Sequence, residues 1–314
     1  GVYFDISKKE DYGKLGQIHI DDNSQSSRIS ENTEKRNQAD FALWKFSQPD
    51  KQRQQEWDSP WGIGFPGWHI ECSTMSAKLL GETIDIHTGG IDHIPTHHNN
   101  EIAQSETAHE QPQAQYSMHS SLVLIDGILI SNSLCISLFF DDLEAKGTSP
   151  LAYRYWLLTA DYKTLLNFTW DAVEAASSAY QKLVQILAST QDTGTVSDTY
   201  KQEFTTLIND DLNTAAGIAL IWKLLKDTDI PDEDKKATIF DFDSVLGLNL
   251  EAVSGLAQNI QQEIPQEIIE IAEQRQQART EKDWEKADEL RDKAAALGYT
   301  IKDSNDGFEV INNL

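Results

Sequence analysis

The segment between Trp68 and Glu101 constrains the fold more strongly than any other part of the sequence. It reads WHIECSTMSAKLLGETIDIHTGGIDHIPTHHNNE. Residues 69–80 have the apolar spacing of a helix, and the glycine that follows them is a typical helix stop. Residues 83–87 alternate as a short strand does, and Gly89 and Gly90 come directly after. Because helix and strand alternate, this segment predicts an α/β fold with a parallel sheet and crossover helices.

Neighbouring elements continue the same alternation. The N-terminal GVYFDI and residues 122–125 predict strands, and Asp126-Gly127 predicts a turn after the second of them. Thr96 predicts the cap of a helix that runs from His97 to about Glu110. In parallel sheets, ligands bind beyond the carboxyl ends of the strands, so the end of the 83–87 strand is the expected binding edge.

The second half of the sequence predicts helices. Apolar residues recur at spacings of three and four in residues 150–162, 170–187, 204–225 and 235–246, which favours a helix bundle. Residues 188–198 are expected to be a loop and residues 251–266 a linker. Residues 267–297 predict a charged amphipathic helix or hairpin, and residues 298–310 predict a small strand pair.

Composition narrows the functional classes. The 314 residues suffice for two or three domains, and no apolar run reaches the roughly 18 residues of a membrane helix. A net charge of −25 argues against a general nucleic-acid binder, although an enzyme acting on tRNA can carry a local basic track on an acidic body. Two cysteines make no disulfide framework, so a cytoplasmic protein is expected. A monomer is the favoured oligomeric state.

Three side chains in the constraining segment are candidate metal ligands. Cys72 offers a thiol, and His97 and Glu101, four residues apart, share one face of the predicted helix. A soft, a borderline and a hard ligand form the mixture that zinc accepts. Taken alone, the spacing leaves the ordinary explanations open, because a single cysteine is commonly a small core residue and HxxxE is frequent on helices.

Several motifs together resemble the cysteinyl-tRNA synthetases, a class I aminoacyl-tRNA synthetase family. WDSPWGIGFPGWHIECS and the segment after it resemble the second half of the family's catalytic domain. LAYRYWLL, LNFTW, NDDLNTA and KADELRD extend the resemblance through the helical half. The resemblance implies the second half of a Rossmann-like catalytic domain, followed by an α-helical anticodon-binding bundle and a small C-terminal α+β module. The expected parts are a connective remnant at 1–34, the catalytic domain at 35–138, a linking segment at 139–170, the bundle at 171–250 and the small domain at 265–314.

The resemblance also implies a site. Cys72, His97 and Glu101 correspond to ligands of one zinc ion, which selects cysteine over serine because a thiolate binds zinc far better than a hydroxyl does. The residues that correspond to the amino-acid and adenylate pocket are Trp68, His87, Gly89, Gly90 and Asp92. The implied substrates and partner are cysteine, ATP and tRNA(Cys).

One departure from the family predicts impaired catalysis. The frame SMHSSLVLIDG precedes the family's lysine-rich KMSKS loop, and here that loop corresponds to residues 129–133, with Leu129 and Asn132 at the lysine positions. Ser131, Asn132 and Ser133 are thus the catalytic candidates of a degenerate loop. The half of the domain with the HIGH signature and a fourth, cysteine ligand is expected to be missing, so the sequence reads as an N-terminally truncated fragment.

Two other interpretations remain open. A non-catalytic synthetase paralogue that binds cysteine, zinc or tRNA fits the altered loop. A cysteine ligase acting on a sugar amine has a similar zinc pocket, but it is expected to lack the anticodon-binding and C-terminal modules that this sequence resembles.

Overall fold

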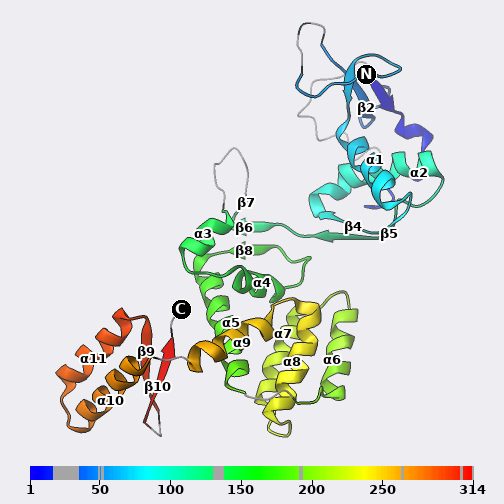
Figure 1. Cartoon of the computed structure of the whole chain (residues 1–314). Helices are drawn as coiled ribbons and strands as arrows, with labels where there is room; N and C mark the ends of the chain where they lie inside the picture. Colours follow the sequence, from blue (N-terminus) through cyan, green and yellow to red (C-terminus); the bar gives the residue numbers. More distant parts are fainter. Residues whose placement is uncertain are drawn as a thin grey trace. The chain divides into compact units, whose positions relative to one another are not determined.

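The computed structural model describes residues 1–16, 35–48, 50, 53–129, 138–190, 194–262, 265–304 and 307–312 (Figure 1). The chain divides into two compact units. The first comprises Gly1–Leu129 and Tyr162–Asn167, and the second Ile130–Asp161 and Phe168–Leu314. Within the described residues, every helix is too short or too polar to cross a membrane.

The first unit opens with an antiparallel sheet of three strands, β1 (Val2–Phe4), β2 (Phe41–Phe46) and β3 (Gly64–Pro66), in that order. Phe4 stacks on Phe41 with ring centroids 5.0 Å apart. Ile6, at the start of the 3-10 helix η1 (Ile6–Lys8), is fully buried, and its backbone N–H donates to Asp40 Oδ1 at 3.1 Å. The predicted N-terminal strand therefore exists, and the residues after it contribute to the core of this unit.

A parallel strand pair forms the part of the first unit that holds the site. The order is α1 (Trp68–Leu80), β4 (Ile84–Gly90), α2 (Asn99–His109) and β5 (Ala114–Ser120). β4 and β5 run parallel, from Ile84 opposite Ala114 to Gly90 opposite Ser120. The predicted helix before Gly81 and the predicted α/β alternation are confirmed. Strand β5 was not predicted from the sequence, although Ala114, Tyr116 and Met118 alternate with polar residues in AQYSMHS as they do in a strand.

The connection between β4 and α2 differs from the prediction. A 3-10 turn, η3 (Ile91–His93), leads into a π-helical turn, η4 (Ile94–His98), and α2 starts only at Asn99. The expectation that Thr96 caps a helix beginning at His97 is wrong, because Thr96 lies inside the π-helical turn. Such turns are rare and are frequently found at functional sites.

A small hairpin sheet completes the first unit. It contains β6 (Val123–Ile125), β7 (Ile128–Leu129) and β8 (Leu166–Phe168), in the order β7-β6-β8. Asp126 and Gly127 join the first two strands with φ angles of 49° and 78°, which is the left-handed pair of a tight hairpin turn. The turn predicted at these two residues is confirmed.

The second unit is dominated by helices (Figure 1). Between residues 138 and 262, the described helices are α3 (Phe140–Ala145), α4 (Pro150–Leu158), α5 (Trp170–Ser189), α6 (Asp198–Asn209), α7 (Thr214–Lys226), α8 (Asp232–Leu246) and α9 (Leu250–Gln262). Phe204 of α6 stacks on Phe242 of α8, with ring centroids 4.1 Å apart and an interplanar angle of 6°. The predicted bundle is therefore present, held by apolar side chains from all its long helices.

Two helical predictions need correction. Residues 204–225 form two helices, because Asp211 and Leu212 adopt positive φ angles and Asn213 caps α7 by accepting from the Ala216 N–H. The apolar spacing continues across the break and conceals it. Residues 251–266 are largely helix α9, whose first residue, Leu250, is fully buried, and not a linker.

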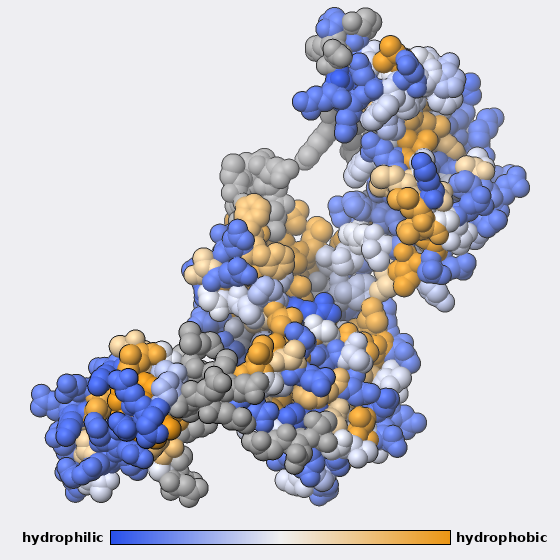
Figure 2. All heavy atoms as spheres, viewed as in Figure 1, coloured by the Kyte–Doolittle hydropathy of each residue, from blue (hydrophilic) through white to orange (hydrophobic). Residues whose placement is uncertain are grey.

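The C-terminal part is a helical hairpin, α10 (Gln266–Thr280) and α11 (Trp284–Ala296), packed with an antiparallel strand pair, β9 (Tyr299–Ser304) and β10 (Gly307–Asn312). Asp283 caps α11 by accepting from the Lys286 N–H. Ile268, Ile271, Leu290 and Ile301 form its apolar core. Hydrophilic residues cover most of its visible face in Figure 2, as expected of charged helices.

Candidate metal centre

The three predicted ligands converge in the first unit. Cys72 lies on α1, His97 in the π-helical turn and Glu101 in the first turn of α2. One ligand atom from each lies within 4.8 Å of the other two. Glu101 is 1% exposed and His97 5% exposed, whereas Cys72 is half-buried. Cys72 thus meets two buried side chains that follow it by 25 and 29 positions in the sequence.

The Glu101 carboxylate makes several close polar contacts within and beside this cluster. Oε2 accepts from Gln113 Nε2 at 3.0 Å and lies 3.2 Å from His87 Nε2. Oε1 lies 2.5 Å from His97 Nε2, yet it has no well-directed hydrogen bond from any described residue. A buried carboxylate oxygen without a partner is costly, and a cation beside it removes that cost.

The protonation states suit a metal. Burial raises the pKa of Glu101, but the His87 and Gln113 side chains outweigh it and hold this pKa below its ordinary value. Burial lowers the pKa of His97, so its imidazole is neutral at neutral pH. Burial, then Glu101 and Glu71, raise the pKa of the Cys72 thiol, so a metal ion has to displace its proton.

His69 orients the His97 ring. The two Nδ1 atoms are 2.9 Å apart, so one of them donates to the other. When His97 Nδ1 donates to His69 Nδ1, the Nε2 atom of His97 keeps the lone pair that a metal requires, and this atom faces Glu101. Burial lowers the pKa of His69 to about 4, which keeps this partner neutral.

A second imidazole pair lies beside the first. His98 Nδ1 is 2.7 Å from His119 Nε2, and burial lowers the pKa of His98 to about 4. The His98 ring fits against Gly89: a Cβ atom at that position would lie 2.6 Å from His98 Cε1. Gly89 thus makes room for an imidazole. Its predicted closeness to an adenylate stays a prediction.

The other predicted pocket residues surround the cluster. The Trp68 ring centroid lies 4.1 Å from that of His97, and Trp68 remains 58% exposed. The Asp92 side chain is 58% exposed and folds back over Gly90, where any Cβ would collide with its Oδ1. The structure therefore brings these side chains to one edge of β4, while their contacts with substrate stay predictions.

The predicted catalytic loop cannot be placed. Ser131, Asn132 and Ser133 lie outside the described residues, as does Cys135, the second of the two cysteines. Leu129, at the position of the first family lysine, is the last residue of β7 and is half-exposed.

Sequence reasoning missed Gln113. Its Nε2 donates to the central carboxylate, and its backbone carbonyl accepts from the Ile84 N–H at the start of β4. Gln113 sits in QPQAQ, which has no pattern typical of a site. The parallel pairing of β4 with β5 brings it beside the cluster, and that pairing was not predictable from the sequence.

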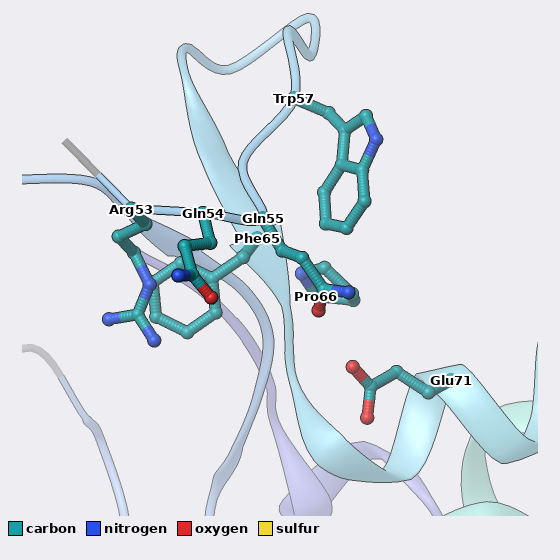
Figure 3. A pocket seen from close by; sticks show the side chains of 7 residues that line it. All are labelled: Arg53, Gln54, Gln55, Trp57, Phe65, Pro66 and Glu71. Atoms are coloured by element: carbon teal, nitrogen blue, oxygen red, sulfur yellow. The ribbon is translucent and has the colours of Figure 1, made fainter.

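A separate concavity lies on the same unit (Figure 3). It has a volume of about 410 Å³, and its lining residues are Arg53, Gln54, Gln55, Trp57, Phe65, Pro66 and Glu71. The Arg53 guanidinium carbon lies 3.9 Å from the centroid of the Phe65 ring. None of the predicted site residues is among those that line it.

Comparison with known proteins identifies the family. Residues 1–178 match the family described as tRNA synthetases class I (C) catalytic domain. A cysteine–tRNA ligase 1 from Burkholderia lata is 42% identical over 98% of this chain and 64% of its own length. Cysteine–tRNA ligases from Chlamydia felis and Finegoldia magna are 39% and 37% identical, each over 98% of this chain and 68% of their own lengths.

The chain belongs to the cysteine–tRNA ligase family. It spans about two thirds of the length of these curated relatives. The α/β region is accordingly part of a class I synthetase catalytic domain with a Rossmann-like core. A second match, described as the cysteinyl-tRNA ligase anticodon binding domain, covers residues 261–310, which is the C-terminal part of the structure and not the bundle at 171–250. Which part of this ligase-family chain contacts an anticodon stays a prediction.

Proposed function

We propose that the chain is the cysteine-selecting and tRNA-binding portion of a cysteine–tRNA ligase. Such an enzyme activates cysteine with ATP and transfers it to the 3′ end of tRNA(Cys). One observation carries the proposal: ligand atoms of Cys72, His97 and Glu101 come from three separate elements and meet within 4.8 Å. Because the chain belongs to the cysteine–tRNA ligase family, a zinc site that selects cysteine is the expected role of these three side chains.

The donor set fits zinc. A thiolate, an imidazole and a carboxylate are all accepted zinc ligands, and three of them leave one position of a tetrahedron open. The buried Oε1 of Glu101 without a well-directed hydrogen bond among the described residues is the local sign that a cation belongs here. When bound there, zinc supplies a thiophilic Lewis acid that prefers the sulfur of cysteine to the oxygen of serine.

The residues of the chain have separate tasks in this proposal. His69 holds the His97 ring so that Nε2 faces Glu101. Trp68 covers the His97 ring and provides an apolar wall for the substrate methylene. The exposed Asp92 carboxylate offers a partner for the substrate ammonium, since a charge-assisted hydrogen bond is strong at such an edge. Because Cys72 has to remain a free thiol, the expected compartment is the reducing cytoplasm.

The altered loop limits the chemistry of the chain. Leu129 and Asn132 stand where the family's lysines neutralise charge on the departing pyrophosphate. Loss of one such preorganised donor costs about 10²–10³ in rate, and two are replaced here. We therefore propose that this chain forms cysteinyl-adenylate slowly at best. Cysteine-dependent exchange of pyrophosphate into ATP measures this, and exchange at the rate of an ordinary synthetase would contradict it.

The same loop supports a second candidate function. A non-catalytic relative that binds cysteine, zinc or tRNA needs the metal cluster but not the lysines. Exchange activity that rises when lysines are restored by Leu129→Lys and Asn132→Lys favours the ligase. Tight cysteine and tRNA binding with no exchange in either form favours the binding protein.

Direct binding tests the proposal most sharply. The purified chain is expected to hold about one equivalent of zinc and, in calorimetry, to bind cysteine but not serine. Removal of the metal by a chelator should abolish this preference, and Cys72→Ala should weaken it. Cys72→Ala that keeps full discrimination between cysteine and serine, or a wild-type protein that discriminates equally well without metal, would overturn the assignment. A tRNA(Cys) titration then separates a tRNA ligase from a ligase acting on a small amine.

A further inference from the structure

We propose that Glu101 serves two metal-binding positions, and that His87 and His98 form with it a second position which holds the ion through nitrogen and oxygen alone. We call the cluster of Cys72, His97 and Glu101 the sulfur position, and the cluster of His87, His98 and Glu101 the nitrogen position. The inference shares one carboxylate with the proposed function, but it does not depend on ligase activity.

Distances support the nitrogen position as directly as they support the sulfur position. One ligand atom each from His87, His98 and Glu101 lies within 4.8 Å of the others. The rings of His87 and His98 are 4.3 Å apart between centroids, and His87 Nε2 lies 3.2 Å from Glu101 Oε2. Two imidazoles and a carboxylate are a donor set that suits several divalent transition metals, zinc included.

A buried nitrogen atom also supports the nitrogen position. His87 Nε2 is buried and makes no well-directed hydrogen bond to any described residue. The other two members are almost completely enclosed, with His98 2% and Glu101 1% exposed. His87 Nε2 has one close polar contact among the described residues, Glu101 Oε2 at 3.2 Å, and because buried polar atoms are normally satisfied, the poor direction of this contact indicates a ligand that completes the pair.

The surroundings fix the His98 ring in a ligating orientation. Its Nδ1 is engaged by His119 Nε2 at 2.7 Å, so Nε2 is the atom left to bind a metal. Gly89 confines the ring from the other side, since a Cβ there would lie 2.8 Å from this Nε2. A partner on the far nitrogen is the usual support of a metal-bound histidine.

Electrostatic repulsion favours one ion that can occupy either position over two ions that are bound at the same time. The two triads share a single carboxylate, and the sulfur position adds one thiolate. Two divalent cations held a few ångströms apart in a buried site repel each other strongly, and neutral imidazoles do not screen that repulsion. The nitrogen position therefore retains the ion when Cys72 is not available as a ligand.

Cobalt binding to the whole chain tests this inference, because Co²⁺ reports its ligands by absorption. Wild-type protein should bind one equivalent and show a sulfur-to-cobalt charge-transfer band. Cys72→Ala should lose that band but keep one equivalent and the ligand-field absorption of a low-coordinate site. Its affinity should fall by at least the roughly 10–100-fold that loss of an outer-shell partner costs. Adding His98→Gln or His87→Gln to Cys72→Ala should then abolish stoichiometric binding.

The control is His109→Gln in the Cys72→Ala background, since His109 ends the same helix, α2, outside both triads. It should bind as Cys72→Ala does, and circular dichroism of every variant confirms that it is folded. Complete loss of metal in Cys72→Ala overturns the nitrogen position, and so does undiminished binding after His98→Gln is added. Two equivalents in the wild type overturn the sharing of one ion. Absence of the sulfur band in the wild type contradicts the proposed function and leaves the nitrogen position to be judged by its own variants.

Discussion

The surroundings of the candidate metal ligands and the interior of the helix bundle bury different kinds of side chain. In and around the cluster of candidate metal ligands, the chain buries a nearly continuous polar series: His97, His98, Asn99, Asn100, Glu101, Gln104 and Ser105. The bundle buries Leu183, Leu187, Ile221, Leu224, Ile239, Phe242 and Leu246. Apolar burial stabilises a fold directly, whereas buried polar groups cost stability unless each one finds a partner. The surroundings of the cluster are thus suited to binding a ligand, and the bundle interior to stabilising the fold.

The largest predicted effect concerns the apolar interior. Phe242→Ala removes a fully buried ring that stacks on Phe204, and should destabilise the second unit by about 3–5 kcal/mol. Chemical denaturation followed by circular dichroism measures this loss. Val245→Ala, on the same helix but 52% exposed, should change stability by no more than about 0.5 kcal/mol. If the two substitutions cost the same, the bundle core is not where the structure locates it.

The polar interior should respond in the opposite way. Glu101→Gln should lower the affinity for zinc by more than about 100-fold, because an anionic ligand is lost. The stability of the metal-free protein should fall by no more than about 1 kcal/mol, far less than for Phe242→Ala, since the glutamine keeps an oxygen that can accept from Gln113. Competition with a chromophoric chelator gives the affinity, and thermal unfolding in chelator gives the stability.

A matched control lies on the same helix. Glu106 pairs with Lys9 at 3.1 Å and Lys14 at 2.6 Å, away from the metal ligands. Glu106→Gln should leave zinc affinity unchanged and lower stability by at most about 1 kcal/mol. Zinc affinity that falls in Glu106→Gln but not in Glu101→Gln would remove this contrast.

A smaller effect should appear where the bundle departs from regular helix. Leu212 has a φ of 58°, which costs an L-residue about 1–2 kcal/mol, and its side chain is 42% exposed. Leu212→Gly should therefore stabilise by a few tenths to about 1 kcal/mol after the backbone entropy of glycine is subtracted. Gln202→Gly, inside α6, should instead destabilise by about 1 kcal/mol. If urea titrations show that both substitutions change the free energy of unfolding in the same direction, the backbone at Leu212 is not strained.

The smallest effect concerns pH. Tyr200 Oη donates to Asp227 Oδ2 at 2.7 Å, which lowers the pKa of Asp227 and raises that of Tyr200 to about 12. A depressed carboxyl pKa stabilises the fold above its unfolded value of about 3.9, and that stability is lost as pH falls through the folded pKa. A raised tyrosine pKa stabilises below about 10, and that contribution is lost as pH rises toward 12. The melting temperature of wild type minus that of Tyr200→Phe should thus be constant from pH 5 to 9 and shrink at both extremes, whereas a flat difference from pH 2 to 12 would show that the bond is absent in solution.

Local patterns in the sequence predicted much of this contrast. Helix α1, strand β4, the Asp126-Gly127 turn and most bundle helices follow from periodicity and stop signals, which act within a few residues. Cys72, His97 and Glu101 could be proposed because their ligand chemistry is distinctive. The place of Gln113 and the parallel pairing of β4 with β5 could not, because strand pairing joins residues about 30 positions apart and leaves no local trace. The break before Asn213 was hidden because apolar spacing persists on both sides of it.

The π-helical turn between β4 and α2 has a consequence for how this region can change. It presents two successive imidazoles, His97 and His98, to neighbouring triads, and both depend on the angular offset that the wider turn creates. In a regular helix each residue advances the side-chain direction by about 100°, so deleting one residue here would swing both rings away together. Residues 91–98 should therefore tolerate exchange of side chains that do not reach the cluster far better than any change in their number.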